Sequence, residues 1–80
     1  MKSLLQLLKE EDNLVMKVNE FGTNVQYHTQ KMCSTESPYV YASEQNYRNK
    51  AMDKLDAALI ELDRTRSELS KYLEELANCY

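Results

Sequence analysis

The chain contains few of the residues that make turns. Its 80 residues include one glycine, Gly22, one proline, Pro38, and no tryptophan. Because glycine and proline mark most tight turns, a fold built from many short elements is excluded. A chain of this length forms one domain at most, so residues 1–80 are treated as a single unit. The composition therefore predicts long helices with few connections.

Long apolar runs and closely spaced cysteines are also lacking. No segment approaches the roughly 20 apolar residues that cross a bilayer. The leucine-rich stretch after Met1 has neither the length nor the cleavage site of a signal peptide. Cys33 and Cys79 lie too far apart in the sequence to form a disulfide framework, which favours free thiols in a reducing compartment. We expect a cytoplasmic protein that does not contact a membrane.

The charged residues are of mixed sign, with 10 basic and 13 acidic residues and a net charge of −3. Proteins that bind nucleic acid usually gather their basic residues in a patch or stripe. The cations available for such a patch are interspersed with acids: Lys2, Lys9, Lys17, Arg48, Lys50 and Lys54. The sequence therefore does not favour nucleic acid as the ligand. A small phage or mobile-element regulator that binds nucleic acid is an alternative function.

Leucines recur every seven residues in the second half of the chain. They are Leu55, Leu62, Leu69 and Leu76, with Met52, Leu59, Leu73 and Tyr80 between them. Placing the first set at d and the second at a predicts a coiled-coil-type helix over about residues 39–79, with Arg66 as the one polar a residue. Small residues beside this stripe, such as Ala51 and Ala58, widen it, as in a helical bundle.

Two serines are candidate caps for the start of this helix. Ser43 would place Glu44 in the first turn, where an acid is favourable. Ser37 would give an earlier start, with Pro38 at the first helical position. On the outer surface, opposite charges three residues apart predict the ion pairs Glu61–Arg64, Asp63–Arg66 and Glu68–Lys71.

The first half of the chain predicts a second helix over about residues 3–33. Ser3 and Gln6 have the spacing of a capping box. Residues spaced three and four apart then form one stripe: Leu4, Leu7, Glu11, Leu14, Val18, Phe21, Val25, His28 and Met32. Gly22 would lie inside this helix, where close approach of another helix would explain it. Residues 34–38 form the loop.

A helix–β-hairpin–helix is the alternative fold. Residues 23–41 are mediocre helix formers, Val25, Tyr27 and Thr29 alternate as in a strand, and Gly22 could end the first helix. An isolated two-stranded hairpin is only marginally stable, however, and its loop would lack glycine. The periodicity favours the continuous helix.

We therefore predict an all-α fold, in which two long antiparallel helices form a hairpin. Two helices alone cannot bury both wide stripes, whereas four can, so the hairpin is expected to self-associate as a homodimer in a four-helix bundle or coiled-coil oligomer. The residues assigned to self-association are Leu55, Leu59, Leu62, Leu69, Leu73 and Leu76. Arg66 and Glu11 interrupt their apolar stripes. Counting from the loop pairs Arg66 with about residue 6, which brings it into the neighbourhood of Glu11, and we expect a contact between the two that specifies register.

In outline, this prediction resembles two groups of small helical hairpins. One is the W-x-G group exported by type VII secretion; the other is the plasmid RNA-binding hairpin Rop. The loop region CSTESPYVYAS has neither Trp nor Gly, and no tyrosine is followed by an acid four residues later, so the resemblance concerns shape. It implies an exported helical hairpin as a second alternative function.

Tyrosines, not enzyme motifs, are the strongest functional signal. The chain has no Gly-rich phosphate loop, no nucleophile elbow and no paired metal-ligand spacing, so we expect no catalysis, cofactor or metal. Between Phe21 and Ser43 the only charges are Lys31 and Glu36. Interface cores are rich in tyrosine and poor in charge. We expect a non-enzymatic scaffold that binds another protein through residues at the loop end: Tyr27, His28, Tyr39, Tyr41 and Tyr47.

Overall fold

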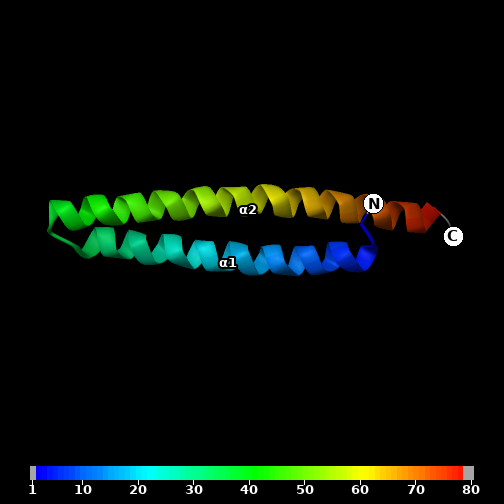
Figure 1. The fold of residues 1–80 in the computed structure, drawn as a ribbon, viewed down its shortest axis with the longest axis horizontal. Helices are drawn as coiled ribbons and strands as arrows, with labels where there is room; N and C mark the ends of the chain where they lie inside the picture. Colours follow the sequence, from blue (N-terminus) through cyan, green and yellow to red (C-terminus); the bar gives the residue numbers. More distant parts are fainter. Residues whose placement is uncertain (1, 79–80) are drawn as a thin grey trace.

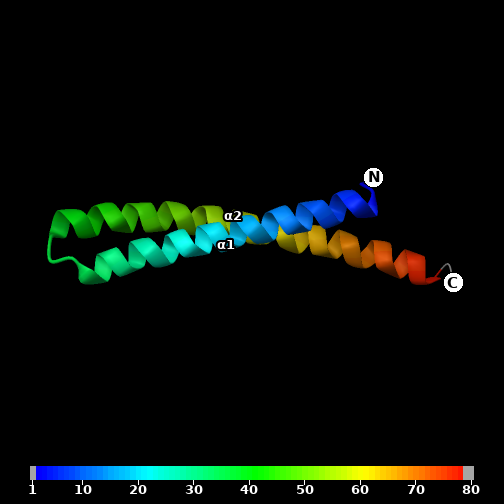
Figure 2. The same cartoon turned by 90° about the horizontal axis from the view of Figure 1, so that it is seen from below.

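The structure, a computed structural model, describes residues 2–78 and confirms the all-α hairpin. Helix α1 (Leu4–Ser34) and helix α2 (Pro38–Asn78) run antiparallel, joined by residues 35–37 (Figure 1). The molecule measures 63 × 15 × 13 Å. Turned by a quarter, the helices cross each other near the middle (Figure 2). Each helix begins within one residue of its predicted range, which was about 3–33 for the first and about 39–79 for the second. Residue 79, the predicted end of the second helix, lies outside the described residues.

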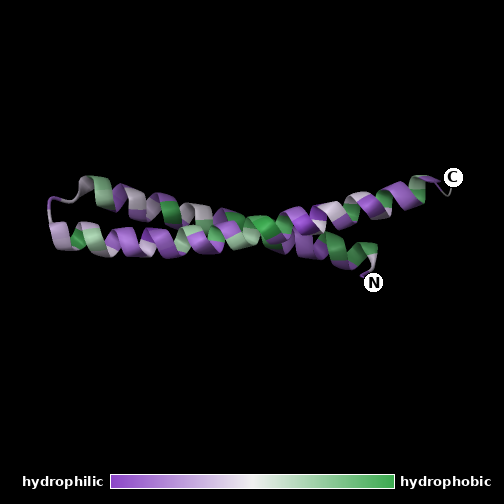
Figure 3. Cartoon of the chain, turned by 90° about the horizontal axis from the view of Figure 1, so that it is seen from above, coloured by the Kyte–Doolittle hydropathy of each residue, from purple (hydrophilic) through white to green (hydrophobic). Residues whose placement is uncertain are grey.

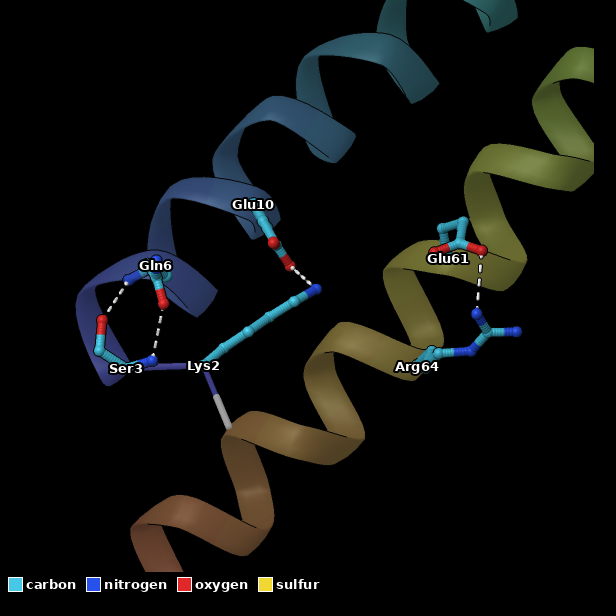
Figure 4. A network of polar contacts seen from close by, with 6 residues as sticks. All are labelled: Lys2, Ser3, Gln6, Glu10, Glu61 and Arg64. Atoms are coloured by element: carbon cyan, nitrogen blue, oxygen red, sulfur yellow. Dashed lines mark hydrogen bonds and ion pairs between the residues drawn. The ribbon is translucent and has the colours of Figure 1, made fainter.

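Helix α1 begins at Leu4 because of its capping box. The Gln6 backbone N–H donates to Ser3 Oγ at 3.2 Å, and the Ser3 backbone N–H donates to Gln6 Oε1 at 2.9 Å (Figure 4). Two N–H groups that the helix leaves unpaired are thereby satisfied, as the sequence predicted. Lys2, which precedes the helix, adds an ion pair with Glu10 at 2.9 Å.

The alternative β-hairpin over residues 23–41 is wrong, since no strand occurs among residues 2–78. Threonine and serine side chains fit into the helix by bonding back to its carbonyl groups. The hydroxyls of Thr23, Thr29 and Ser34 donate to the carbonyl oxygens four residues earlier, at 2.7–2.9 Å. Such local bonds accommodate residues of low helix propensity. The helical spacing of the buried side chains thus outweighed propensity.

Helix α2 begins at Pro38, so the start near Ser43 is wrong and the earlier start after Ser37 is correct. The Val40 N–H donates to Ser37 Oγ at 3.4 Å, and the Tyr41 N–H donates to the Ser37 carbonyl at 3.0 Å. Proline has no N–H and a fixed φ, so it costs nothing at this first position. Glu44 therefore lies nearly two turns further along the helix than the Ser43 start implied.

The core is one seam between the two helices. In α1 the predicted stripe faces the seam, with Leu7 and Met32 buried and its other members half-buried. In α2 the seam consists of Ala51, Leu55, Ala58, Leu62, Thr65 and Leu69. Figure 3 shows hydrophobic residues where the helices cross and in the first turns of α1.

Within one hairpin, the predicted a positions of the second helix lie outside the seam. Met52, Leu59 and Leu73 are exposed, whereas the small residues beside them are buried. In the observed register, Leu55, Leu62 and Leu69 alternate with Ala51, Ala58 and Thr65. Small residues at every second core position let two single helices approach closely, so the larger a residues are left on one flank. Tyr80, another predicted a residue, lies outside the described residues.

Gly22 lies within α1 and neither ends nor caps it, since the helix continues to Ser34. A Cβ atom built on Gly22 would meet nothing within 4 Å beyond its own helix backbone. The predicted close approach of the second helix at Gly22 is therefore wrong within one hairpin. The residue lowers the helix propensity of α1 without any packing gain inside the chain.

We expect Gly22→Ala to raise the free energy of unfolding by about 1 kcal/mol, because alanine removes backbone freedom from the unfolded chain and finds open space in the fold. The midpoint of thermal unfolding, followed by circular dichroism at low protein concentration where the single hairpin prevails, should rise by about 4–8 °C. Ala57→Gly, at an exposed helical position, is the matched control and should lower the midpoint similarly. A midpoint lower than that of the wild type would contradict the open space found at Gly22 within one hairpin.

Candidate functional site

A buried carboxylate organises the loop end of the hairpin. Glu44 is 9% exposed, and its Oε2 accepts a hydrogen bond from His28 Nδ1 at 2.5 Å. Its other oxygen lies 3.8 Å from Lys31 Nζ. A carboxylate loses its hydration on burial, and these two partners on α1 replace it. The pair ties α1 to α2 at the end where both helices meet the loop.

Aromatic rings surround His28. Tyr47 stacks on its imidazole with ring centres 5.5 Å apart, and Tyr27 meets it edge-on at 5.2 Å. Lys31 Nζ lies 4.6 Å from the Tyr27 ring centre, an exposed cation–π contact. The side chain of Tyr27 and the Glu44 carboxylate together raise the pKa of Lys31 above its ordinary value of 10.5. We name Tyr27, His28, Lys31, Glu44 and Tyr47 the loop-end cluster.

The other two predicted binding residues lie outside this cluster. Tyr39 and Tyr41 occupy the first turn of α2, where Tyr39 is 87% exposed and Tyr41 is 45% exposed. The structure therefore brings Tyr27, His28 and Tyr47 together and leaves Tyr39 and Tyr41 nearer the loop. From Tyr39 to Tyr47 the helix advances about 12 Å. Tyr39 and Tyr41 are two residues apart on the helix, so their side chains point to different sides of it. The tyrosines thus surround the loop end and form neither a pocket nor a single face.

Sequence reasoning missed Glu44 and Arg48 as inward-facing residues. Glu44 was assigned to an exposed first turn, and Arg48 was counted as a surface cation. Both fall in the register of Ala51 and Leu55, seven residues earlier. Arg48 Nε is buried and has no hydrogen-bond partner among residues 2–78. Extending the observed heptads toward the loop is the signal that would have found them.

The predicted contact between Arg66 and Glu11 is present, with Arg66 Nε donating to Glu11 Oε2 at 3.2 Å. Arg66 thus bridges the helices in place of the predicted pair with Asp63. Glu61 and Arg64 form their predicted pair at 3.1 Å (Figure 4). The Arg66–Glu11 contact fixes the antiparallel register near the open end of the hairpin.

The six leucines assigned to self-association have two different environments. Leu62 and Leu69 are buried within the hairpin and Leu55 is half-buried, so these three belong to its own core. Leu59, Leu73 and Leu76 are exposed. Only the second group is accessible to another molecule.

The two long flanks of the seam differ in character. One flank, which we name the apolar face, carries one charge pair, between Arg66 and Glu11 at the edge of the seam. Its other residues are uncharged: Leu8, Val15, Gly22, Thr29, Gln45, Met52, Leu59 and Leu73. Near the open end it forms a shallow groove lined by Leu4, Leu8, Glu11, Arg66, Leu69, Ser70 and Leu73. The opposite flank, the charged face, is lined by Lys2, Lys17, Lys54, Glu61, Glu68 and Glu75.

Residues 2–78 contain neither a cluster of metal ligands nor a membrane-spanning helix. Among residues 2–78, no three His, Cys, Asp or Glu side chains gather closely enough to hold a metal ion. Cys33 is an exposed free thiol, and Cys79 lies outside the described residues. Neither helix, over its described length, contains a segment long and apolar enough to cross a membrane.

Comparisons with protein-family models, with curated proteins and with solved structures find no match to this chain. The exposed tyrosines, the loop-end cluster and the apolar face are therefore the features on which a function can be based.

Proposed function

We propose that the chain is a non-enzymatic protein-interaction module, which self-associates and binds a second protein through its tyrosine-rich loop end. The observation that supports this most is the exposure of Tyr39, Tyr41 and Tyr47 beside an ordered cluster. A tyrosine has few rotatable bonds, so it contributes contact area at low entropic cost. Surfaces of this kind are enriched at protein interfaces and form their energetic centres.

The loop-end cluster suits this role because it preorganises part of the surface. Glu44 holds His28, and His28 in turn stacks on Tyr47. A binding surface that is already ordered loses less conformational entropy when the partner docks. The hydrogen bond between the buried Glu44 carboxylate and the His28 imidazole thus orders the exposed ring of Tyr47, which is available to the partner.

The partner is expected to be a protein rather than a nucleic acid. Two of the six candidate cations are already engaged or turned inward, since Lys2 pairs with Glu10 and Arg48 Nε is buried. Binding to nucleic acid releases counterions and weakens steeply with added salt. A contact centred on tyrosines should depend little on salt.

We expect the double substitution Tyr39→Ala and Tyr41→Ala to weaken partner capture at least tenfold, because two exposed aromatic anchors are lost from the interface. The measurement is retention of partner proteins from native lysate on the immobilised chain, at low and at high salt. Circular dichroism should be unchanged, since Tyr39 contributes little to the fold at 87% exposure.

Ile60→Ala is the matched control, because Ile60 is an exposed apolar residue of α2 far from the loop. It should leave capture unchanged. Equal retention by the tyrosine variant, or retention abolished by salt, would contradict the proposed binding surface.

A further inference from the structure

The hairpin exposes more surface than a compact protein of its size. Its accessible surface is 6303 Å², whereas compact monomers of 9.4 kDa expose about 5,000 Å². The excess is larger than the roughly 800 Å² that each partner loses in a specific dimer. No side chain among the described residues is less than 2% exposed. The excess accessible surface of one hairpin is thus large enough for a second hairpin to bury it in a dimer.

We infer that a second copy of the chain covers the apolar face, with the loops of both copies at the same end of the dimer. This inference rests on the proposed self-association and adds its surface and its orientation. The apolar face is the flank suited to the contact, because Met52, Leu59 and Leu73 are 42–55% exposed on it. On the charged face, such a contact would bury lysines and glutamates, at a cost in hydration.

The charge pair on the apolar face determines the orientation. A two-fold axis along the hairpin keeps every residue at its own height and sets α1 of one copy over α2 of the other. Arg66 of each copy then meets Glu11 of the other. Arg66 is 58% exposed, and its bond to Glu11 uses one of five guanidinium donors. The two pairs would join into a ring of alternating charge.

The opposite orientation fits poorly. Leu59 lies midway between Gln45 and Leu73 on the apolar face, so an axis across the hairpin there would put Arg66 of one copy beside Met52 of the other. Leu73 would meet Gln45 in the same way. Each of these contacts pairs a polar group with an apolar one, which costs hydration without a compensating bond. With the loops together, apolar residues of one copy face apolar residues at the same distance along the hairpin in the other copy.

Gly22 also fits this dimer. It lies on the apolar face and has open space above its Cα atom. With the loops together, α2 of the second copy passes over it near Met52, whose flexible side chain can fill such gaps. The close approach that Gly22 lacks within one hairpin is then made between copies.

The arrangement has a consequence for binding. Both tyrosine-rich loop ends lie at one end of the dimer, so two equivalent partner sites stand side by side. A partner with two matching segments would bind the second site at a raised effective concentration.

A charge-swap experiment tests the orientation. Glu11→Arg and Arg66→Glu each place like charges at the same height, and each variant alone should dimerise at least tenfold more weakly than the wild type. Mixed one to one, they should form a heterodimer as readily as the wild type forms its homodimer, because each Arg then meets a Glu of the other copy. Native mass spectrometry separates the three dimers by mass. The chain with both substitutions should dimerise like the wild type and is the control.

Distances between labels give a second readout. The exposed Cys33 thiol near the loop, spin-labelled in a Cys79→Ser chain, should give a distance within about 30 Å for loops together and about 50 Å for loops apart, from the helix rise. A long distance, or a mixture that forms no preferred heterodimer, would overturn the orientation while self-association stands. A chain that stays monomeric at all concentrations would overturn the proposed self-association itself, independently of partner binding.

Discussion

Leu62→Ala is expected to lower the free energy of unfolding by about 3 kcal/mol, whereas Leu59→Ala should cost the hairpin less than about 1 kcal/mol. The two leucines lie one turn apart in the same heptad pattern and differ in burial, 6% exposed against 44%. Truncating the buried residue removes its transfer free energy and leaves a gap in the seam. Truncating the exposed one removes little that the folded chain uses.

The measurement is thermal unfolding by circular dichroism at low protein concentration, where association contributes least. Leu62→Ala should lower the midpoint by more than 10 °C, since about 1 kcal/mol corresponds to 4–8 °C in a domain of this size. Sedimentation equilibrium should show the reverse ranking for self-association, because Leu59 lies on the apolar face. Equal destabilisation by both substitutions would contradict the observed core register.

The architecture was predictable because the signals for it are local and redundant. The capping box of Ser3 and Gln6, the three-and-four spacing from Leu4 to Met32 and the shortage of turn residues all indicate the same hairpin. The contact between Arg66 and Glu11 was predictable in part. Equal distances from the loop pair Arg66 with about residue 6, and Glu11 was chosen because it is the nearby polar interruption of the first stripe. These features need no knowledge of side-chain packing.

The register of the second helix was not predictable from the same pattern. Met52, Leu59 and Leu73 are more hydrophobic than Ala51, Ala58 and Thr65, so a sequence reading assigns the larger residues to the core. A two-helix seam has room for one large row and one small row. Which row faces inward depends on the opposing helix, and that information is absent from the heptads of α2 alone.

The candidate site divides in a similar way. Tyrosine content and low charge made the loop end the candidate surface, since both are properties of composition. The role of Glu44 remained hidden because the candidate start at Ser43 made it a first-turn residue. With the helix beginning at Pro38, the same heptad spacing turns Glu44 inward toward His28. A shift of six residues at one cap, from Ser43 to Ser37, thus separated a surface acid from the centre of the cluster.

The last prediction concerns this interaction. His28→Leu should lower the free energy of unfolding by about 2 kcal/mol, because the buried Glu44 carboxylate loses its hydrogen-bond donor and keeps only Lys31 at 3.8 Å. Replacing both partners, His28→Leu with Glu44→Leu, should recover most of that loss or exceed the wild-type stability, since apolar residues then fill the same space. Urea unfolding of the four chains at neutral pH gives the coupling energy between the two sites.

Phe21→Leu, a conservative change elsewhere on the α1 seam, is the control and should show no coupling to Glu44→Leu. If the effects of His28→Leu and Glu44→Leu simply added in the double variant, the imidazole and the carboxylate would not be coupled. The expected result has a functional corollary. The double variant should be at least as stable as the single one yet lose the stack of His28 on Tyr47. Partner capture should then fall although the fold is preserved, which would separate the contribution of the cluster to recognition from its contribution to stability.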